Sequence, residues 1–211
     1  MDIAQLERPT DEGIYARELA HRTANILQHA IAALHLASRG DTRHTWQAIE
    51  RISGAADLQR ILAGEDGDGT EIGEHIADVC RAVRRMNATD APIDVVVRSE
   101  RMLLDGRSAR RMGMIVAELV GNAIRHGVRD RGGTVTVTLR RTRFGGRLAV
   151  EDDGAGGGWV RNGGQGHGIV NALAGSLGGH VRRSRTRSGL SRVEVTTPPL
   201  LRAAPSVGPE A

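Results

Sequence analysis

Apolar residues recur every three or four positions along the first sixty residues, and this spacing predicts two amphipathic helices. The first spans about residues 14–38, and the second spans about 42–62 after Gly40 in "SRGD" interrupts the pattern. The apolar stripes contain Leu19, Leu27, Ile31 and Leu34, and then Trp46, Ile49, Ile52 and Ile61. Because two helices cannot enclose a core, we expect this helical hairpin to pair with a second copy as a four-helix bundle.

The pattern changes after the glycine- and acid-rich segment "AGEDGDGTE", residues 63–71, which we interpret as a linker. "GTVTVTLRRTR" and "GRLAVEDDG" then alternate like two antiparallel strands joined across Gly145 and Gly146. Helices are predicted over 71–87, 107–127 (closed by Gly127) and 168–179, extended segments over 92–100 and 101–106, and a hairpin over 180–197 that turns at Ser188 and Gly189. This order predicts an α+β sandwich of one mixed sheet with helices on one face.

These patterns divide the chain into two expected domains. The hairpin occupies residues 12–63, a linker follows over 64–70, and the sandwich occupies 71–197. The tail over 198–211 is rich in small residues and proline, and we expect it to be disordered.

The charge is balanced, with 29 Lys plus Arg against 25 Asp plus Glu and a net charge of +4. Such a mild excess, spread along the chain, does not favour nucleic-acid binding, and the four aromatic residues are too few for a base-stacking platform. Two arginine-rich runs are expected to be solvated strand faces first and a docking patch for an acidic partner second. They comprise arginines 140, 141, 143 and 147, and arginines 182, 183, 185 and 187.

Cys80 is the only cysteine, so neither an intrachain disulfide nor a cysteine metal cluster can form. No apolar run approaches the roughly 20 residues that span a bilayer, and the N-terminus does not resemble a signal peptide. We therefore expect a cytoplasmic protein with neither a membrane nor a nucleic acid among its partners.

Three segments within about 50 residues carry candidate chemistry. In "AELVGNAIRHG", Glu118 and Asn122 lie one helical turn apart and could ligate Mg²⁺ and orient a water. In "VEDDGAGGG", Asp152 ends a strand and could accept a hydrogen bond from an exocyclic amine, while Gly154 and Gly156 allow a flat base to approach. In "GGQGHGIVNAL", a glycine-rich loop enters a helix, which makes an anion site suited to phosphate. Together, they predict a nucleotide site.

Residues 107–197 resemble the ATP-binding domain of the GHKL superfamily, which includes gyrase, Hsp90-type chaperones, histidine kinases and MutL. The resemblance implies that Asn122 coordinates Mg²⁺, that Glu118 assists at the same site and that Asp152 holds the adenine amino group. By this resemblance Glu118 and Asn122 form the N box, Asp152, Gly154 and Gly156 form the first glycine box, and Gly166 and Gly168 belong to the second, where residues 166–168 would contact phosphate. Arg125, after the N box, is expected to line the ATP site. His126, also after the N box, and His167, inside the second glycine box, either line the same site or have no role there. The loop over about 156–165 corresponds to the ATP lid.

The front hairpin decides between members of this superfamily. "ELAHRTANILQ" resembles the phosphoacceptor helix of histidine kinases that read His-Arg-x-x-Asn-x-Leu-Gln, which makes His21 the expected phosphoacceptor. Glu18 and Asn25 lie one turn before and after it, where Glu18 could fix the ring tautomer and Asn25 could hold a water or a phosphoryl group. His29, His35 and His44 are rivals, of which His35 shares the face of His21.

The sequence therefore predicts a histidine kinase without a recognisable sensor, which uses ATP and Mg²⁺ and passes phosphate to a response-regulator receiver domain. Its input would come from an upstream sensor protein or from a ligand of the hairpin. Two alternatives stay open: a phosphotransfer or scaffold protein whose kinase-like domain is inactive, and an anti-sigma-factor serine kinase of the same superfamily.

Overall fold

The computed structural model describes residues 42–63, 69–154, 165–200 and 202–203, together with residues 28, 30–32, 35 and 37–40 of the first expected helix. Of residues 165–167 and 202–203 it describes the backbone alone. The described part of 28–38 is helical, and α2 has the predicted bounds, Thr42–Leu62. The interval from 14 to 27 lies outside the described residues.

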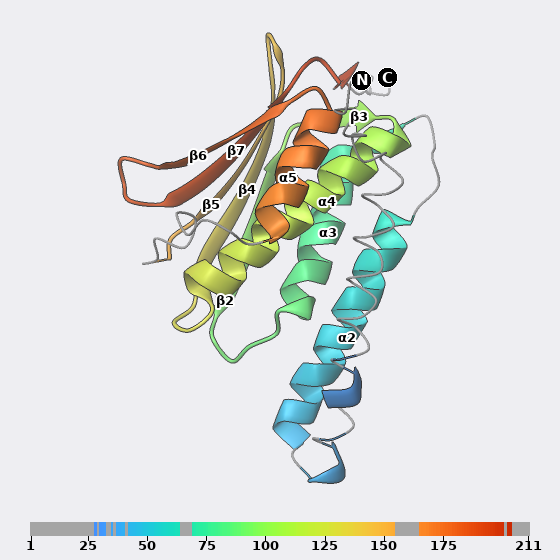
Figure 1. The fold of residues 1–211 in the computed structure, drawn as a ribbon, viewed down its shortest axis with the longest axis vertical. Helices are drawn as coiled ribbons and strands as arrows, with labels where there is room; N and C mark the ends of the chain where they lie inside the picture. The colour runs from blue at the N-terminus through green and yellow to red at the C-terminus, as the bar shows by residue number, and fades with distance from the viewer. Residues whose placement is uncertain are drawn as a thin grey trace, which may run out of the picture.

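Helix α2 packs along α3, Ile72–Met86, at the point where Gly54 removes the side chain between them (Figure 1). A Cβ atom on Gly54 would lie 2.5 Å from the backbone nitrogen of Met86, so only glycine allows this approach. Polar contacts extend the same junction: Arg85 pairs with both Glu50 and Asp57, and the Arg51 guanidinium donates to the carbonyl of Ala88 at 2.8 Å. The second arm of the hairpin is thus bound tightly to the first helix of the sandwich.

Within the described residues, five strands form one mixed sheet in the order β2-β4-β5-β7-β6. Strands β2 and β4 are parallel and the other neighbours are antiparallel. Their bounds are Ile93–Ser99 (β2), Gly133–Thr142 (β4), Gly145–Asp152 (β5), His180–Arg185 (β6) and Ser191–Thr197 (β7). The predicted turn at Ser188 and Gly189 is confirmed by a left-handed Gly189, with φ of 86°.

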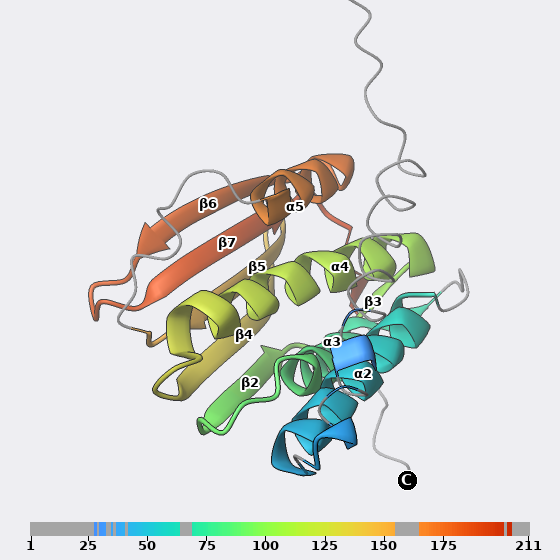
Figure 2. The ribbon, with the colours of Figure 1, turned by 60° about the horizontal axis from the view of Figure 1, so that its bottom comes forward.

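Three helices cover one face of this sheet, as predicted (Figure 2). They are α3, α4 (Gly106–Ala123) and α5 (Gln165–Ser176), which lie over β2, β5 and β6 respectively, while α2 lies outside α3. The core forms between these layers because the inward strand positions and the apolar helix stripes meet there. It includes Ile76, Val83, Ile115, Leu119, Val137, Leu148, Val150 and Val195.

The turn between β4 and β5 differs from the prediction. It lies at Arg143 and Phe144, and both Gly145 and Gly146 belong to β5. A Cβ atom on Gly145 would lie only 1.9 Å from the carbonyl oxygen of Thr197, so Gly145 is required by the close approach of β7. The sequence pattern suggested that the glycine pair forms the turn, whereas in the structure Gly145 is needed for close packing between strands.

A second, smaller sheet was not expected. Within the described residues it has the order β1-β3-β8, formed by Thr70–Glu71, Met102–Leu104 and Arg202–Ala203. Strand β8 lies in the segment that we expected to be disordered, so that expectation is wrong for these two residues. The expected linker likewise ends in a strand that pairs with β3.

None of the helices in the described part of the chain is long and apolar enough to cross a bilayer.

Candidate nucleotide-binding site

The C-terminal end of α4 carries the first part of the candidate site. Glu118 and Asn122 are both half-buried and lie one turn apart, as predicted. The helix does not stop at Gly127 as expected, because residues Ile124–Val128 continue it as a π-helical turn, η1. Such turns are rare and are frequently found at functional sites. The Arg125 guanidinium in this turn donates a 2.7 Å hydrogen bond to the amide oxygen of Asn122.

The C-terminal end of β5 brings Asp152 against this turn. Asp152 is only 1% exposed, and its Oδ1 accepts a 3.1 Å hydrogen bond from the backbone N–H of Gly154. A buried carboxylate is stabilised only where hydrogen-bond donors surround it, which suits an oxygen that receives an amine from a ligand. Asp152 and Gly154, predicted from the sequence, are therefore together in the structure.

Gly127 joins the two segments, and the sequence reading missed this role. A Cβ atom on Gly127 would lie 2.5 Å from Asp152 Oδ1, and one on Gly154 would lie 2.4 Å from the carbonyl oxygen of Gly127. The turn that follows the N box thus contacts the first glycine box through the backbone of two glycines. The sequence did contain an indication of this role. Glycine inside a helical pattern lowers the stability of the helix by about 1 kcal/mol relative to alanine, so its presence usually has a packing reason.

The third segment lies at the same end of the molecule. Figure 1 shows that α5 begins beside the end where α4 runs into η1 and where β5 ends. Gly168 lies in the first turn of α5, and a Cβ atom there would meet nothing within 4 Å, so no described neighbour requires glycine. The backbone of Gly166 and His167 belongs to the same turn, whereas Gly156 lies outside the described residues.

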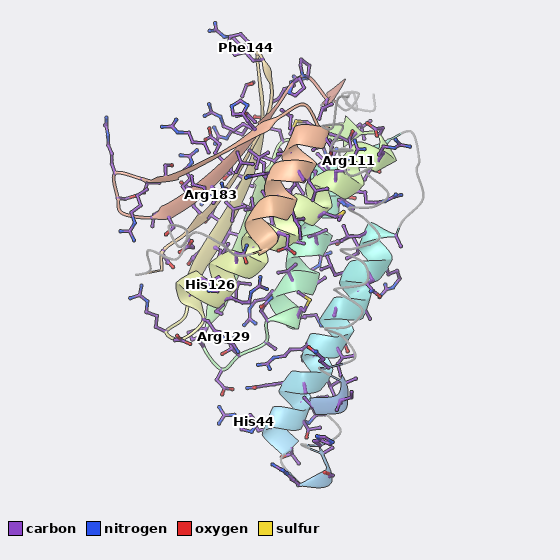
Figure 3. The ribbon with its side chains drawn as sticks, viewed as in Figure 1. His44, Arg111, His126, Arg129, Phe144 and Arg183 are labelled. Atoms are coloured by element: carbon purple, nitrogen blue, oxygen red, sulfur yellow. The ribbon has the colours of Figure 1, made fainter. Side chains whose placement is uncertain are left out.

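The histidines considered as site residues or phosphoacceptors lie in different parts of the molecule. His126 is exposed on η1 at the candidate site, while His44 lies near the start of α2, below His126 in Figure 3. His35 is exposed on the described part of the first helix. The expected phosphoacceptor His21 and its neighbours Glu18 and Asn25 lie outside the described residues.

Comparisons with known proteins identify the domain that holds this site. The family of histidine kinase-, DNA gyrase B- and HSP90-like ATPases matches residues 107–202, from the start of α4 to β8. Residues 107–202 are a GHKL ATPase domain. The GHKL domain therefore contains Glu118, Asn122, Asp152 and the start of α5, and it agrees with the predicted α+β sandwich.

Most of the chain is similar to histidine kinases. Blue-light-activated histidine kinase 2 of Erythrobacter litoralis is 28% identical over 207 residues, which cover 90% of this chain and 59% of that protein. Sensor histidine kinase PdtaS of Mycobacterium tuberculosis is 28% identical over 147 residues, which cover 66% of this chain and 29% of that protein. The chain thus spans little more than half, or less, of the relatives that it matches.

Solved structures show the same fold. The histidine kinase domain of an Erythrobacter litoralis blue-light-activated kinase matches with a TM-score of 0.56 and 22% identity, covering 87% of this chain and 94% of that one. A bacterial phosphotransferase matches with a TM-score of 0.60 and 14% identity, covering 92% and 98%. Both neighbours are less than 25% identical, so these matches show that most of the chain shares their fold.

The residues of the GHKL domain fit ATP with a metal shared between protein and phosphates. Glu118 and Asn122 offer oxygen ligands from one helix face, which suits a hard cation such as Mg²⁺. Among the described residues there is no group of three or more histidine, cysteine, aspartate or glutamate side chains that could hold a metal alone. A Mg²⁺ ion held by these two oxygen donors would take its other ligands from phosphate oxygens and water.

Proposed function

We propose that this protein is an ATP-dependent histidine kinase that phosphorylates its own His21. The observation that supports this most is the contact of Gly127 with Asp152 and Gly154, because it brings the N box and the first glycine box into one site. Bound ATP with Mg²⁺ would supply the transferable phosphoryl group and the leaving group. The residues of the chain would bind and orient these groups and handle the proton of the histidine.

The proposed roles follow from the chemistry of each group. Asp152 would accept the adenine amino group, and Asn122, assisted by Glu118, would ligate Mg²⁺. The backbone N–H groups of residues 166–168 at the start of α5 would bind phosphate, with Arg125, His126 and His167 beside it. These proposed roles are supported by the positions of the elements, because the end of α4, the end of β5 and the start of α5 lie at one end of the domain (Figure 1).

The transfer itself would use a neutral imidazole. A ring nitrogen of His21 would attack the γ-phosphorus with its lone pair, and the bond from the γ-phosphorus to the bridging oxygen would break as ADP takes that electron pair. Glu18 would accept the proton from the other ring nitrogen, which leaves a phosphoramidate with a neutral ring and a negatively charged phosphoryl group. Asn25 would then face the water or the receiver domain, whose aspartate would take the phosphoryl group.

The assembly proposed with this function is a homodimer through the hairpin of residues 12–63, with the GHKL domain acting within one chain or across the dimer. An upstream sensor protein and a response regulator would be the partners. These proposals are supported by the similarity of the chain to proteins that are named histidine kinases.

Labelling with γ-labelled ATP and Mg²⁺ tests the function directly, with wild type beside His21→Ala. Label that is acid-labile, alkali-stable and lost only in His21→Ala is the expected result. Label that is retained in His21→Ala would move the acceptor to His35, and acid-stable label on serine would support the serine kinase alternative.

Asp152→Ala tests the nucleotide site independently of the acceptor. We expect it to weaken binding of a fluorescent ATP analogue more than any other single substitution in the site, because the buried carboxylate is the group that recognises adenine. Equal affinity in wild type and Asp152→Ala would contradict the adenine role. Failure of the wild type itself to bind the analogue would support the phosphotransfer or scaffold alternative.

A further inference from the structure

The hairpin between β4 and β5 ends in an exposed aromatic ring. Phe144 is 71% exposed and is the most exposed large apolar side chain in the described residues. Figure 3 places it at the tip of the hairpin, which projects beyond the other strands and the helices. A single exposed apolar side chain is common, but this ring stands at a projecting tip within an arginine-rich segment, and that combination suits a contact outside the chain.

The turn holds this ring in a defined position. Thr142 Oγ1 donates to the carbonyl of Gly145 at 3.1 Å and accepts from the backbone N–H of Phe144 at 3.3 Å. The Arg143 guanidinium lies over the ring, 4.3 Å from its centroid, in a cation–π contact. The tip therefore presents one phenyl ring together with a positive charge.

Further arginines lie on both faces of the hairpin, on the strand residues next to the turn. Arg140 and Arg147 are direct cross-strand partners, although like charges placed opposite each other destabilise a sheet. Arg141 follows Arg140 and therefore points to the other face. Two acids lie at the base of the tip: Glu194 is 3.6 Å from Arg147, and Glu100 accepts from the backbone N–H of Arg141. The segment over 140–147 contains four arginines and no acid.

We propose that this tip, residues 140–147, binds the surface of an anionic phospholipid bilayer. A planar layer of phosphates can contact arginines on both faces of a projecting hairpin at once, whereas a protein pocket would have to enclose the tip. The phenyl ring would enter the boundary between headgroups and acyl chains, as aromatic and leucine side chains of interfacial segments do. The absence of a spanning helix does not bear on this contact.

The tip is far from the nucleotide site, because β5 runs from one to the other. Its eight residues, from Gly145 to Asp152, separate the two by about 25 Å at the rise of an extended strand. Membrane contact at the tip would therefore leave the ATP site open to water. The inference does not rest on the proposed kinase function.

Flotation of the full chain with lipid vesicles tests the proposal. The probe is vesicles of equal parts phosphatidylcholine and phosphatidylglycerol, compared with pure phosphatidylcholine. We expect binding to the anionic vesicles alone, weakened by added salt. Replacing Phe144 with Ser should reduce the partition coefficient about tenfold, and the pair Arg141→Gln with Arg143→Gln should reduce it about 25-fold, at about fivefold for each arginine.

Arg187→Gln is the matched control, since it removes the same charge from the exposed turn of the β6–β7 hairpin. We expect it to keep vesicle binding, and Phe144→Trp to keep it as well. Unchanged melting temperatures and ATP-analogue affinities would show that the tip variants are folded. The single variant Arg143→Gln is compared with this control. An equal loss of vesicle binding in Arg187→Gln and Arg143→Gln would overturn the proposal in favour of general charge attraction. Wild type that floats with neither vesicle would overturn it in favour of an acidic protein partner.

Discussion

A methyl group at position 127 would lie 2.5 Å from Asp152 Oδ1, far inside the normal separation of a carbon and a carboxylate oxygen. A single added methyl group is therefore enough to disturb the candidate site. Two glycines, Gly127 and Gly154, allow the backbone of η1 to contact the end of β5, and Asn122 stands one turn before that contact.

Gly127→Ala should destabilise the fold by about 1–3 kcal/mol, because Asp152 or the turn must shift. It should also lower the affinity for an ATP analogue, which urea unfolding and a fluorescence titration would measure separately. Gly175→Ala in α5 is the control, since a Cβ atom there meets nothing within 4 Å and the helix should gain about 0.5–1 kcal/mol. Full ATP affinity in Gly127→Ala would refute the role of this contact.

Asn122→Ala should abolish phosphorylation while the melting temperature changes little. The substitution removes the proposed Mg²⁺ ligand and one exposed hydrogen bond from Arg125, and such a bond contributes about 1 kcal/mol at most. Asn171→Ala is a matched control, because Asn171 also accepts from an arginine, Arg183, on a neighbouring element. Phosphorylation that persists in Asn122→Ala with an intact fold would exclude the assignment of the metal ligand.

At the scale of elements, the junction of α2, α3 and α4 contains a histidine that the sequence did not single out. His75 on α3 has its Nε2 buried without a hydrogen-bond partner among the described residues, facing Gly113 and Leu62. Burial lowers the pKa of His75, and the effect is only partly opposed by the charge of Asp78 and a hydrogen bond with the backbone of Ala109. The folded protein therefore favours the neutral ring.

His75 should make stability depend on pH. Because its pKa is lower in the folded state, the unfolded chain binds more protons below the ordinary value of about 6.5. The free energy of unfolding should thus fall as the pH drops from about 7 through 6.5 and below. Urea unfolding across this range would measure the fall, which His75→Leu should reduce. An equal fall in His75→Leu would assign the pH dependence to other groups.

The elements also show what sequence reasoning could and could not predict. Helix α2 and the strands of the large sheet were predicted within a few residues, because their periodic patterns are long and end at glycines or prolines. Strands β1, β3 and β8 have two or three residues each, too few for alternation to mark all of them as strands. The roles of Gly127 and Gly145 depend on contacts with distant strands, which a local pattern does not contain.

At the scale of the whole molecule, α2 carries exposed apolar side chains. Trp46 is 67% exposed and Ile49 is 41% exposed, one turn apart on this helix. Neighbouring exposed apolar residues mark interaction surfaces, and the proposed hairpin dimer would cover them. The tight junction of α2 with α3 would then connect the dimer to each GHKL domain.

Trp46→Glu should shift the chain from dimer to monomer, because it places a charge in the proposed four-helix bundle. Analytical ultracentrifugation over a range of concentrations would measure the change. Arg43→Glu, an exposed substitution one turn earlier on the same helix, controls for added negative charge. A wild type that is monomeric throughout this range would contradict the dimer.

Strand β3 has a consequence for the design of fusions and permuted chains. It lies between β1 and β8 and pairs with both, so Thr70–Glu71 and Arg202–Ala203 lie on the two sides of one strand although they are far apart in the sequence. Domains whose ends lie close together tolerate insertion and circular permutation. We therefore expect the part from Thr70 to Ala203 to tolerate insertion into a loop of another protein, with both of its ends joined to that loop. We also expect it to tolerate circular permutation, in which a short linker joins Ala203 to Thr70 and the new termini lie at the Ser188–Gly189 turn.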